Sequence, residues 1–145
     1  MISFIISCAV AMALSIVFCI LDIKYRMIPH KVMIPSACIM IPLIVWTYAT
    51  YYLPNFGWIS IMWGIIGVVL PFMWYLFMKK WIGEMDLKWL MIIFALCPFG
   101  IIYIIMGMIV FTLIMWVICH KKTKIMPAMI PITLSLIMFF IISLI

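Results

Sequence analysis

The charged residues of this 145-residue chain are confined to three short windows, and this confinement is the strongest constraint on its fold. All nine Lys and Arg and all three Asp and Glu lie within Asp22–Lys31, Lys79–Lys88 and Lys121–Lys124. The stretches between these windows hold 47 and 32 residues without a charge. Uncharged apolar runs of about 20 residues or more are typical of membrane-spanning helices. With 72% hydrophobic and 8% charged residues, the sequence excludes a soluble globular domain and predicts a membrane protein.

Turn signals divide the uncharged stretches into helical hairpins. The cluster Leu53–Gly57 predicts arms at about Val32–Tyr52 and Trp58–Met78, each near the roughly 20 residues that a spanning helix needs. In the next stretch, Pro98–Gly100 predicts a second hairpin, and a single tilted helix is the alternative. The hairpin is favoured because it keeps all basic residues on one side of the membrane, as cytoplasmic loops require.

The arm Trp89–Cys97 is too short to cross a membrane by itself. Nine residues make about 14 Å of helix, against a hydrocarbon core of roughly 30 Å. We therefore expect this helix to begin earlier, including Glu84 and Asp86. This extension places Asp86 at or below the membrane surface instead of in a free loop.

The complete prediction is an all-α membrane protein with six transmembrane helices. The first span is Ile2–Leu21, interpreted as a retained helix because it lacks a basic leader and a cleavage site. The last is about Ile125–Ile145, with Pro127 and Pro131 in its first turns, where a helix tolerates proline. Residues 1–145 then form a single domain with both termini outside and three basic loops in the cytoplasm.

The net charge of +6 is explained by topology and by anionic lipid, so nucleic acid is not an expected partner. The cysteines are scattered and form no Cys-x-x-Cys pair, so the sequence indicates no zinc site, disulfide framework or other cofactor. These five are Cys8, Cys19, Cys38, Cys97 and Cys119.

Asp22 and Asp86 are the leading candidates for chemistry, because the predicted topology places both at the same membrane face. Ionisable groups at membrane depth are costly and are functional candidates for that reason. Two close carboxylates share one proton and can hydrolyse a peptide bond, one acting as base and the other as acid. The alternative is that each aspartate forms an ion pair with Lys24, Arg26 or Lys88 in a solvated loop.

Three motifs, in order, resemble those of the type IV prepilin peptidases. In Asp22–Pro29 an aspartate precedes an Ile-Pro pair, Ile28-Pro29, by six residues within a basic loop. Gly83–Lys88 resembles the family's Gly-x-Gly-Asp-x-Lys motif, which relates these enzymes to intramembrane GxGD aspartyl proteases. The proline-containing stretch Ile125–Pro131 is similar to the one that opens the family's last helix.

The resemblance implies that Asp22 and Asp86 are the catalytic pair. It also implies that Gly83 lets the backbone pass close to them and that Lys88 is the motif lysine. Two positions depart from the family pattern. Met85 stands at the usual second glycine, and His30 follows Ile-Pro where asparagine is common.

The implied activity is cleavage of class III signal peptides from pilin-like or archaellin-like precursors at the cytoplasmic membrane boundary. The implied partners are those precursors and the lipid bilayer. The chain lacks the cysteine-rich cytoplasmic region of the long bacterial members, so it resembles the short form, without N-methyltransferase activity. For Glu84, contact with the basic leader is one interpretation, and an exposed loop carboxylate is the other.

Three other functions compete with the peptidase. One is a non-catalytic scaffold or assembly subunit of a pilus or secretion system. A small transporter is disfavoured because the spans offer few polar groups at mid-membrane. A cysteine peptidase using Cys119 is disfavoured because His120, as its chain neighbour on a helix, points about 100° away, and His30 would have to approach from another loop.

Overall fold

In the computed structural model, residues 1–25, 28–78, 84–119 and 128–145 are described. Within these ranges the chain is helical and has no strand, so the all-α prediction is confirmed. In chain order the elements are α1 (Ile2–Tyr25), α2 (His30–Thr47), the π-helical turn η1 (Tyr48–Tyr52), α3 (Leu53–Phe56), α4 (Trp58–Met78), α5 (Glu84–Leu96), the 3-10 turn η2 (Pro98–Gly100), α6 (Ile101–Cys119) and α7 (Met129–Leu144).

Four helical segments in the described part of the chain are long and apolar enough to cross a bilayer. They are Ile2–Tyr25, His30–Phe56, Trp58–Phe77 and Pro98–Ile118. The helices α5 and α7 are shorter than these four segments, with 13 and 16 residues. At 1.5 Å per residue α5 is about 20 Å long, less than the hydrocarbon thickness of roughly 30 Å.

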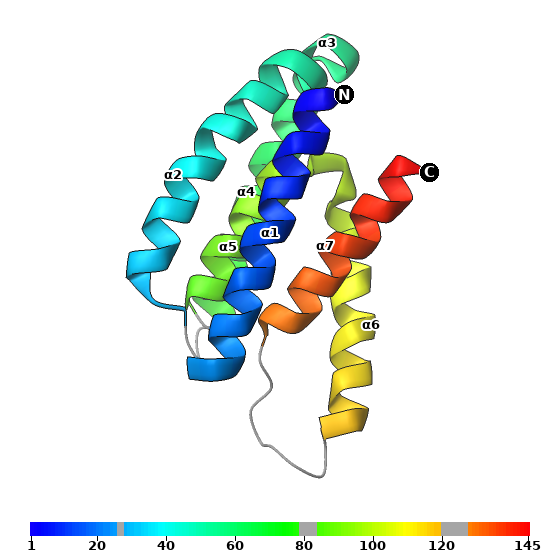
Figure 1. Ribbon diagram of the computed structural model, residues 1–145. Coiled ribbons are helices and arrows are strands. Elements are labelled where there is room, and N and C mark those ends of the chain that lie inside the picture. The colour runs from blue at the N-terminus through cyan, green and yellow to red at the C-terminus, as the bar shows by residue number, and fades with distance from the viewer. Residues whose placement is uncertain (26–27, 79–83, 120–127) are drawn as a thin grey trace.

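The chain runs back and forth between two ends of the bundle (Figure 1). The beginning of α1 and the end of α7 lie at the upper end. The ends of α1, α4 and α6 and the beginnings of α2, α5 and α7 point toward the lower end, and these six helix ends flank the three charged windows. The chain breaks its helix after Leu96 and reverses at Pro98–Gly100, as the hairpin interpretation predicts.

The first hairpin reverses inside the predicted turn cluster Leu53–Gly57, but its first helical arm ends later than the predicted Tyr52. Instead of leaving the helix at Leu53, the chain continues through α3 and reverses at Gly57, whose φ of +60° suits a residue without a side chain. Pro54 has no N–H group and would normally end a helix, but here the hydrogen-bond register changes before it. The π-helical turn η1 shifts the hydrogen-bond register just before Pro54, and the Leu53 N–H bonds to the Tyr48 carbonyl.

Helix α5 lies at the centre of the bundle, in contact with α1, α2, α4 and α7. Most of its side chains are buried, and Trp89, Ile93 and Phe94 are fully buried. A helix that is apolar around its circumference is stable only inside a protein or a bilayer. The neighbouring helices therefore bury α5, including the first turn, which carries Asp86. The prediction that this helix includes Glu84 and buries Asp86 is confirmed.

Close packing of α6 against α7 depends on Gly107. A Cβ atom at this position would lie 2.7 Å from Cβ and 3.3 Å from Cα of Ser135 on α7. Gly107→Leu is expected to push the two helices apart and destabilise the fold by about 1–3 kcal/mol, the usual cost of overpacking. Thermal unfolding in detergent measures this. Val110→Leu, which adds the same side chain at an exposed position of α6, is the control. Equal melting temperatures for both variants would contradict the α6–α7 contact.

Candidate active site

Both predicted catalytic aspartates are buried, and they lie at the ends of different helices. Asp22 lies in the last turns of α1 and is 6% exposed, whereas Asp86 lies in the first turn of α5 and is 9% exposed. Aspartates are almost never buried to this degree unless a partner stabilises them. The surroundings of each carboxyl group therefore decide what it can do.

The partner of Asp22 is the beginning of α7. The backbone N–H of Met129, the first residue of that helix, donates a hydrogen bond to Oδ2 of Asp22 over 3.4 Å. The N-terminus of a helix carries unsatisfied N–H groups and the positive end of the helix dipole, both of which favour an anion. The Met129 amide thus gives the buried carboxyl group of Asp22 a hydrogen-bond partner.

Asp86 is in the opposite situation. Burial, and to a smaller extent the negative charge of Asp22, together raise the pKa of Asp86 to about 7. The two carboxyl groups are thus within electrostatic range of each other, although 63 residues separate them in the chain. At neutral pH a large fraction of Asp86 is protonated, so one carboxyl group can act as base while the other acts as acid.

The charges next to Asp86 on its own helix neutralise each other. Nζ of Lys88 lies 2.7 Å from Oε1 of Glu84, and both side chains are about half exposed. Lys24 is exposed, with its Nζ 5.1 Å from the ring centroid of Tyr25. Among the described residues, neither Asp22 nor Asp86 forms an ion pair. The sequence left open that Lys24, Arg26 or Lys88 forms an ion pair with an aspartate in a solvated loop. Of these, Lys88 pairs with Glu84, and Arg26 lies outside the described residues.

The other motif residues lie at or near the starts of α2 and α5 where the structure describes them. Ile28 is buried, and Pro29 precedes the first residue of α2 with extended backbone angles of φ −69° and ψ 141°. Its carbonyl accepts hydrogen bonds from the N–H groups of Val32 and Met33. His30 is exposed at the start of α2, and Met85 is partly buried against the core. Gly83 lies outside the described residues.

The sequence prediction did not include Met129, whose backbone amide holds Asp22. The proline-containing stretch before it marked the beginning of the last helix, and helix beginnings can bind anions. Which anion lies there cannot be predicted from the sequence, because it depends on how α7 packs against α1.

The cysteine alternative, which uses the side chain of Cys119, lies outside the described part of the structure. Cys8 and Cys97 are free, fully buried thiols whose Sγ atoms lie 4.0 Å apart. His120 and the side chain of Cys119 lie outside the part of the chain that is described. Within that part, no three His, Cys, Asp or Glu side chains gather as they would around a metal ion.

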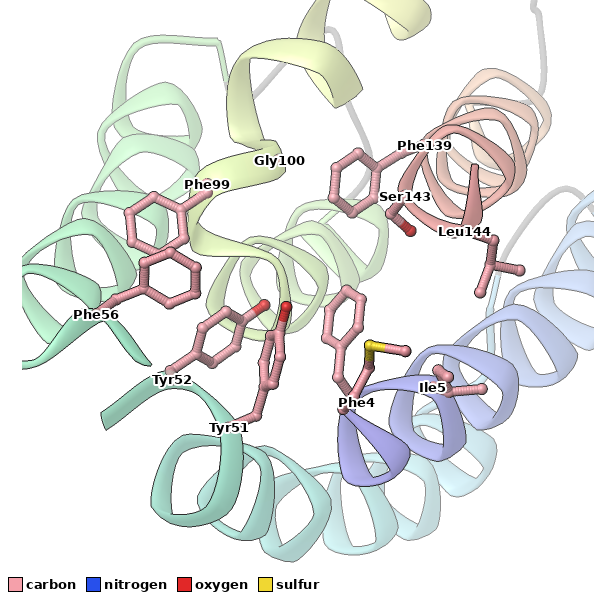
Figure 2. Close-up of a pocket in the computed structure, with 11 residues that line it drawn as sticks. Phe4, Ile5, Tyr51, Tyr52, Phe56, Phe99, Gly100, Phe139, Ser143 and Leu144 are labelled. Atoms are coloured by element: carbon pink, nitrogen blue, oxygen red, sulfur yellow. The ribbon is translucent and has the colours of Figure 1, made fainter. Parts of the chain in front are cut away.

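An aromatic cavity of about 210 Å³ lies at the other end of the bundle (Figure 2). Its lining comes from the beginning of α1, from η1 and α3, from η2 and from the end of α7; it includes Phe4, Tyr51, Tyr52, Phe56, Phe99 and Phe139. Phe4 precedes Asp22 by 18 residues, about 27 Å along the helix. The cavity is therefore separate from the aspartates.

Comparisons of the chain with protein-family models, with curated proteins and with solved structures find no match. The features of the chain that point to a function are its sequence motifs and the geometry of its two buried aspartates. Both lead to the same pair of residues, Asp22 and Asp86.

Proposed function

We propose that the chain is a membrane aspartyl endopeptidase that removes the leader, a class III signal peptide, from type IV pilin-like or archaellin-like precursors. The observation that carries this proposal is the pair of buried carboxyl groups, Asp22 and Asp86, in which burial and the Asp22 charge raise the pKa of Asp86 to about 7. Pairs of carboxyls with separated proton affinities are the usual means of acid–base hydrolysis.

The sequence motifs support the substrate class. Asp22 with Ile28-Pro29, Gly83–Lys88 and Ile125–Pro131 occur in the order found in type IV prepilin peptidases, and together they extend over most of the chain. Substrates of that family are transmembrane helices with short basic leaders. Their scissile bond lies at the cytoplasmic membrane boundary, which is the depth proposed for both aspartates.

In the proposed reaction, Asp22 begins as the carboxylate and Asp86 as the acid. Asp22 takes a proton from water while the water oxygen attacks the scissile carbonyl carbon, and Asp86 donates its proton to the carbonyl oxygen. The C–N bond of the resulting gem-diol then breaks. The leaving nitrogen receives the proton held by Asp22, and Asp86 regains a proton from a hydroxyl group of the gem-diol. Each carboxyl group ends in the state in which it began.

We further propose six membrane passes, with α5 and α7 added to the four long helices. Helix α5 need not match the full bilayer thickness because α1, α2, α4 and α7 surround it. The six-pass arrangement places all three basic windows in the cytoplasm of a cell membrane, in agreement with the positive-inside tendency. The aspartates then face the cytoplasmic side, where water and substrate leaders are available.

The test is cleavage of candidate precursors by the full-length protein. The purified chain is reconstituted into lipid vesicles with each class III precursor from the same genome, and mass spectrometry reads the N-terminus of the product. We expect a single cut near the membrane boundary in at least one precursor. If no precursor is cut, the peptidase proposal fails and the non-catalytic assembly subunit becomes the better interpretation.

A further inference from the structure

One buried serine connects the three helices that form the site. The Nε1–H of Trp89 on α5 donates to Oγ of Ser15 on α1 over 2.8 Å. The single hydroxyl proton of Thr133 on α7 is shared between two backbone carbonyls, that of Met129 at 2.8 Å and that of Ser15 at 3.2 Å from Oγ1. Ser15 and Trp89 are fully buried and Thr133 is nearly so.

Each of these residues lies on its helix close to a group of the site. Trp89 follows Asp86 by three residues, one turn of α5, so the two share a face. Ser15 precedes Asp22 by seven residues, two turns of α1, which again gives a shared face. Thr133 follows Met129 by four residues, and the Met129 amide is the one that binds Asp22. The contacts at Ser15 therefore lie one or two turns above the carboxyl pair on all three helices.

We propose that Ser15, Trp89 and Thr133 are positioning residues, whose hydrogen bonds set the axial register of α1, α5 and α7 and thereby the separation of the two carboxyl groups. This inference rests on the proposed function. Two aspartates on separate helices act together only if those helices cannot slide or rotate relative to each other.

Apolar packing alone would fix this register less tightly. The Trp89 ring meets that of Phe18 edge to face, with centroids 4.7 Å apart and planes at 85°. Such contacts are favourable over a range of helix displacements, whereas a hydrogen bond has narrow limits of distance and angle. The indole has a single N–H, and leaving it unpaired in an apolar core is costly. Its bond to Ser15 thus restricts both the ring and α5.

The first test removes the hydrogen bond from either side. Ser15→Ala deletes the acceptor, and Trp89→Phe deletes the donor but keeps an aromatic ring against Phe18. We expect each to lower kcat by about ten-fold or more, because small misplacements of catalytic groups are expensive. KM is expected to change little, since neither side chain contacts substrate. The double variant is expected to resemble the single variants, because both remove the same bond, and Ser15→Thr, which keeps a hydroxyl group, is expected to restore kcat.

The matched control is Tyr52→Phe. The Tyr52 hydroxyl donates a buried hydrogen bond of 2.8 Å to the Leu96 carbonyl. This bond connects η1 to the last residue of α5, at the end of the helix away from Asp86. Tyr52→Phe is expected to lower the melting temperature about as much as Ser15→Ala and to leave kcat unchanged. If the two variants lower kcat equally, or if Ser15→Ala leaves it unchanged, the positioning role is refuted.

A second readout is independent of cleavage. The chain has only two aspartates, so carbon-13 labelled aspartate lets infrared spectroscopy follow the protonation of Asp22 and Asp86 alone. In Ser15→Ala we expect the Asp86 titration midpoint to move down from about 7, because loosened packing admits water and separates the carboxyl groups. An unchanged midpoint would overturn the inference. Should the protein cleave no precursor, this titration still tests whether Ser15 holds the two carboxyl groups together.

Discussion

Replacing either aspartate by asparagine is expected to abolish cleavage of the precursor without unfolding the protein. Asparagine has nearly the shape of aspartate but can neither accept nor deliver a proton. Since proton transfer by one positioned group contributes about 10²- to 10⁴-fold to rate, Asp22→Asn and Asp86→Asn should each lose at least about 100-fold. The double variant should be no worse than the single ones, because the two groups act in one proton cycle. The measurement is the initial rate of product formation in vesicles.

Glu84→Gln is the matched control for these variants. It removes a carboxylate from the same charged window, two residues before Asp86, but this carboxylate is half exposed and pairs with Lys88. Exposed ion pairs contribute little to stability. We expect cleavage within about two-fold of wild type. Loss of activity in Glu84→Gln equal to that in Asp86→Asn, or cleavage that survives Asp22→Asn, would contradict the two-aspartate mechanism.

The pH dependence of the melting temperature shows whether Asp86→Asn loses activity through misfolding or through loss of the catalytic acid. Because folding raises the pKa of Asp86 to about 7, wild type loses stability as the pH rises from the ordinary aspartate range through 7. Asparagine has no charge to bury. The variant is therefore expected to melt above wild type at pH 8, with the difference shrinking at pH 5. A lower melting temperature at pH 8 would indicate that Asp86 has a structural role.

The sequence predicted those features that depend on length and charge. The span from Trp89 to Cys97 was too short for a membrane helix, and this predicted an earlier start that includes Glu84 and buries Asp86; α5 does begin at Glu84, although its 13 residues are still fewer than a full span needs. The hairpin at Pro98–Gly100 followed from keeping the basic residues together. Each of these conclusions needs only the rise of a helix, the thickness of a bilayer and the high cost of burying a charge.

The features that depend on contacts between helices could not be predicted in this way. Nothing in the spacing of Asp22 and Met129, 107 residues apart, shows that the α7 amide binds that carboxylate. The hydrogen bond from Trp89 to Ser15 is hidden for the same reason, since serine and tryptophan are common in membrane helices. The continuation of the helix through Pro54 depends on a shift of hydrogen-bond register, whereas local turn signals predicted that the helical arm ends at about Tyr52.

The pH dependence of cleavage follows from the opposite roles of the two carboxyl groups. If Asp86 is the acid, only the form in which it is protonated is active, and this fraction falls about ten-fold for each pH unit above its pKa. With a pKa of about 7, the rate is expected to level off below about pH 6 and to fall about 50-fold from pH 7 to pH 9, because about half of Asp86 is protonated at pH 7 and about one hundredth at pH 9. The midpoint belongs to the coupled pair, since Asp22 acts on Asp86.

Histidine also titrates near neutrality, so a control must show that Asp86 causes the alkaline decline. The chain has two histidines, His30 and His120. The variant His30→Gln with His120→Gln is expected to keep the wild-type pH profile. In Asp22→Asn, infrared titration should place the Asp86 midpoint below that of wild type, yet above the ordinary aspartate range, because burial is the larger cause of the shift and the Asp22 charge the smaller. A rate that is flat between pH 6 and pH 9, or an Asp86 midpoint that does not respond to Asp22→Asn, would show that the two carboxyl groups do not work as a pair.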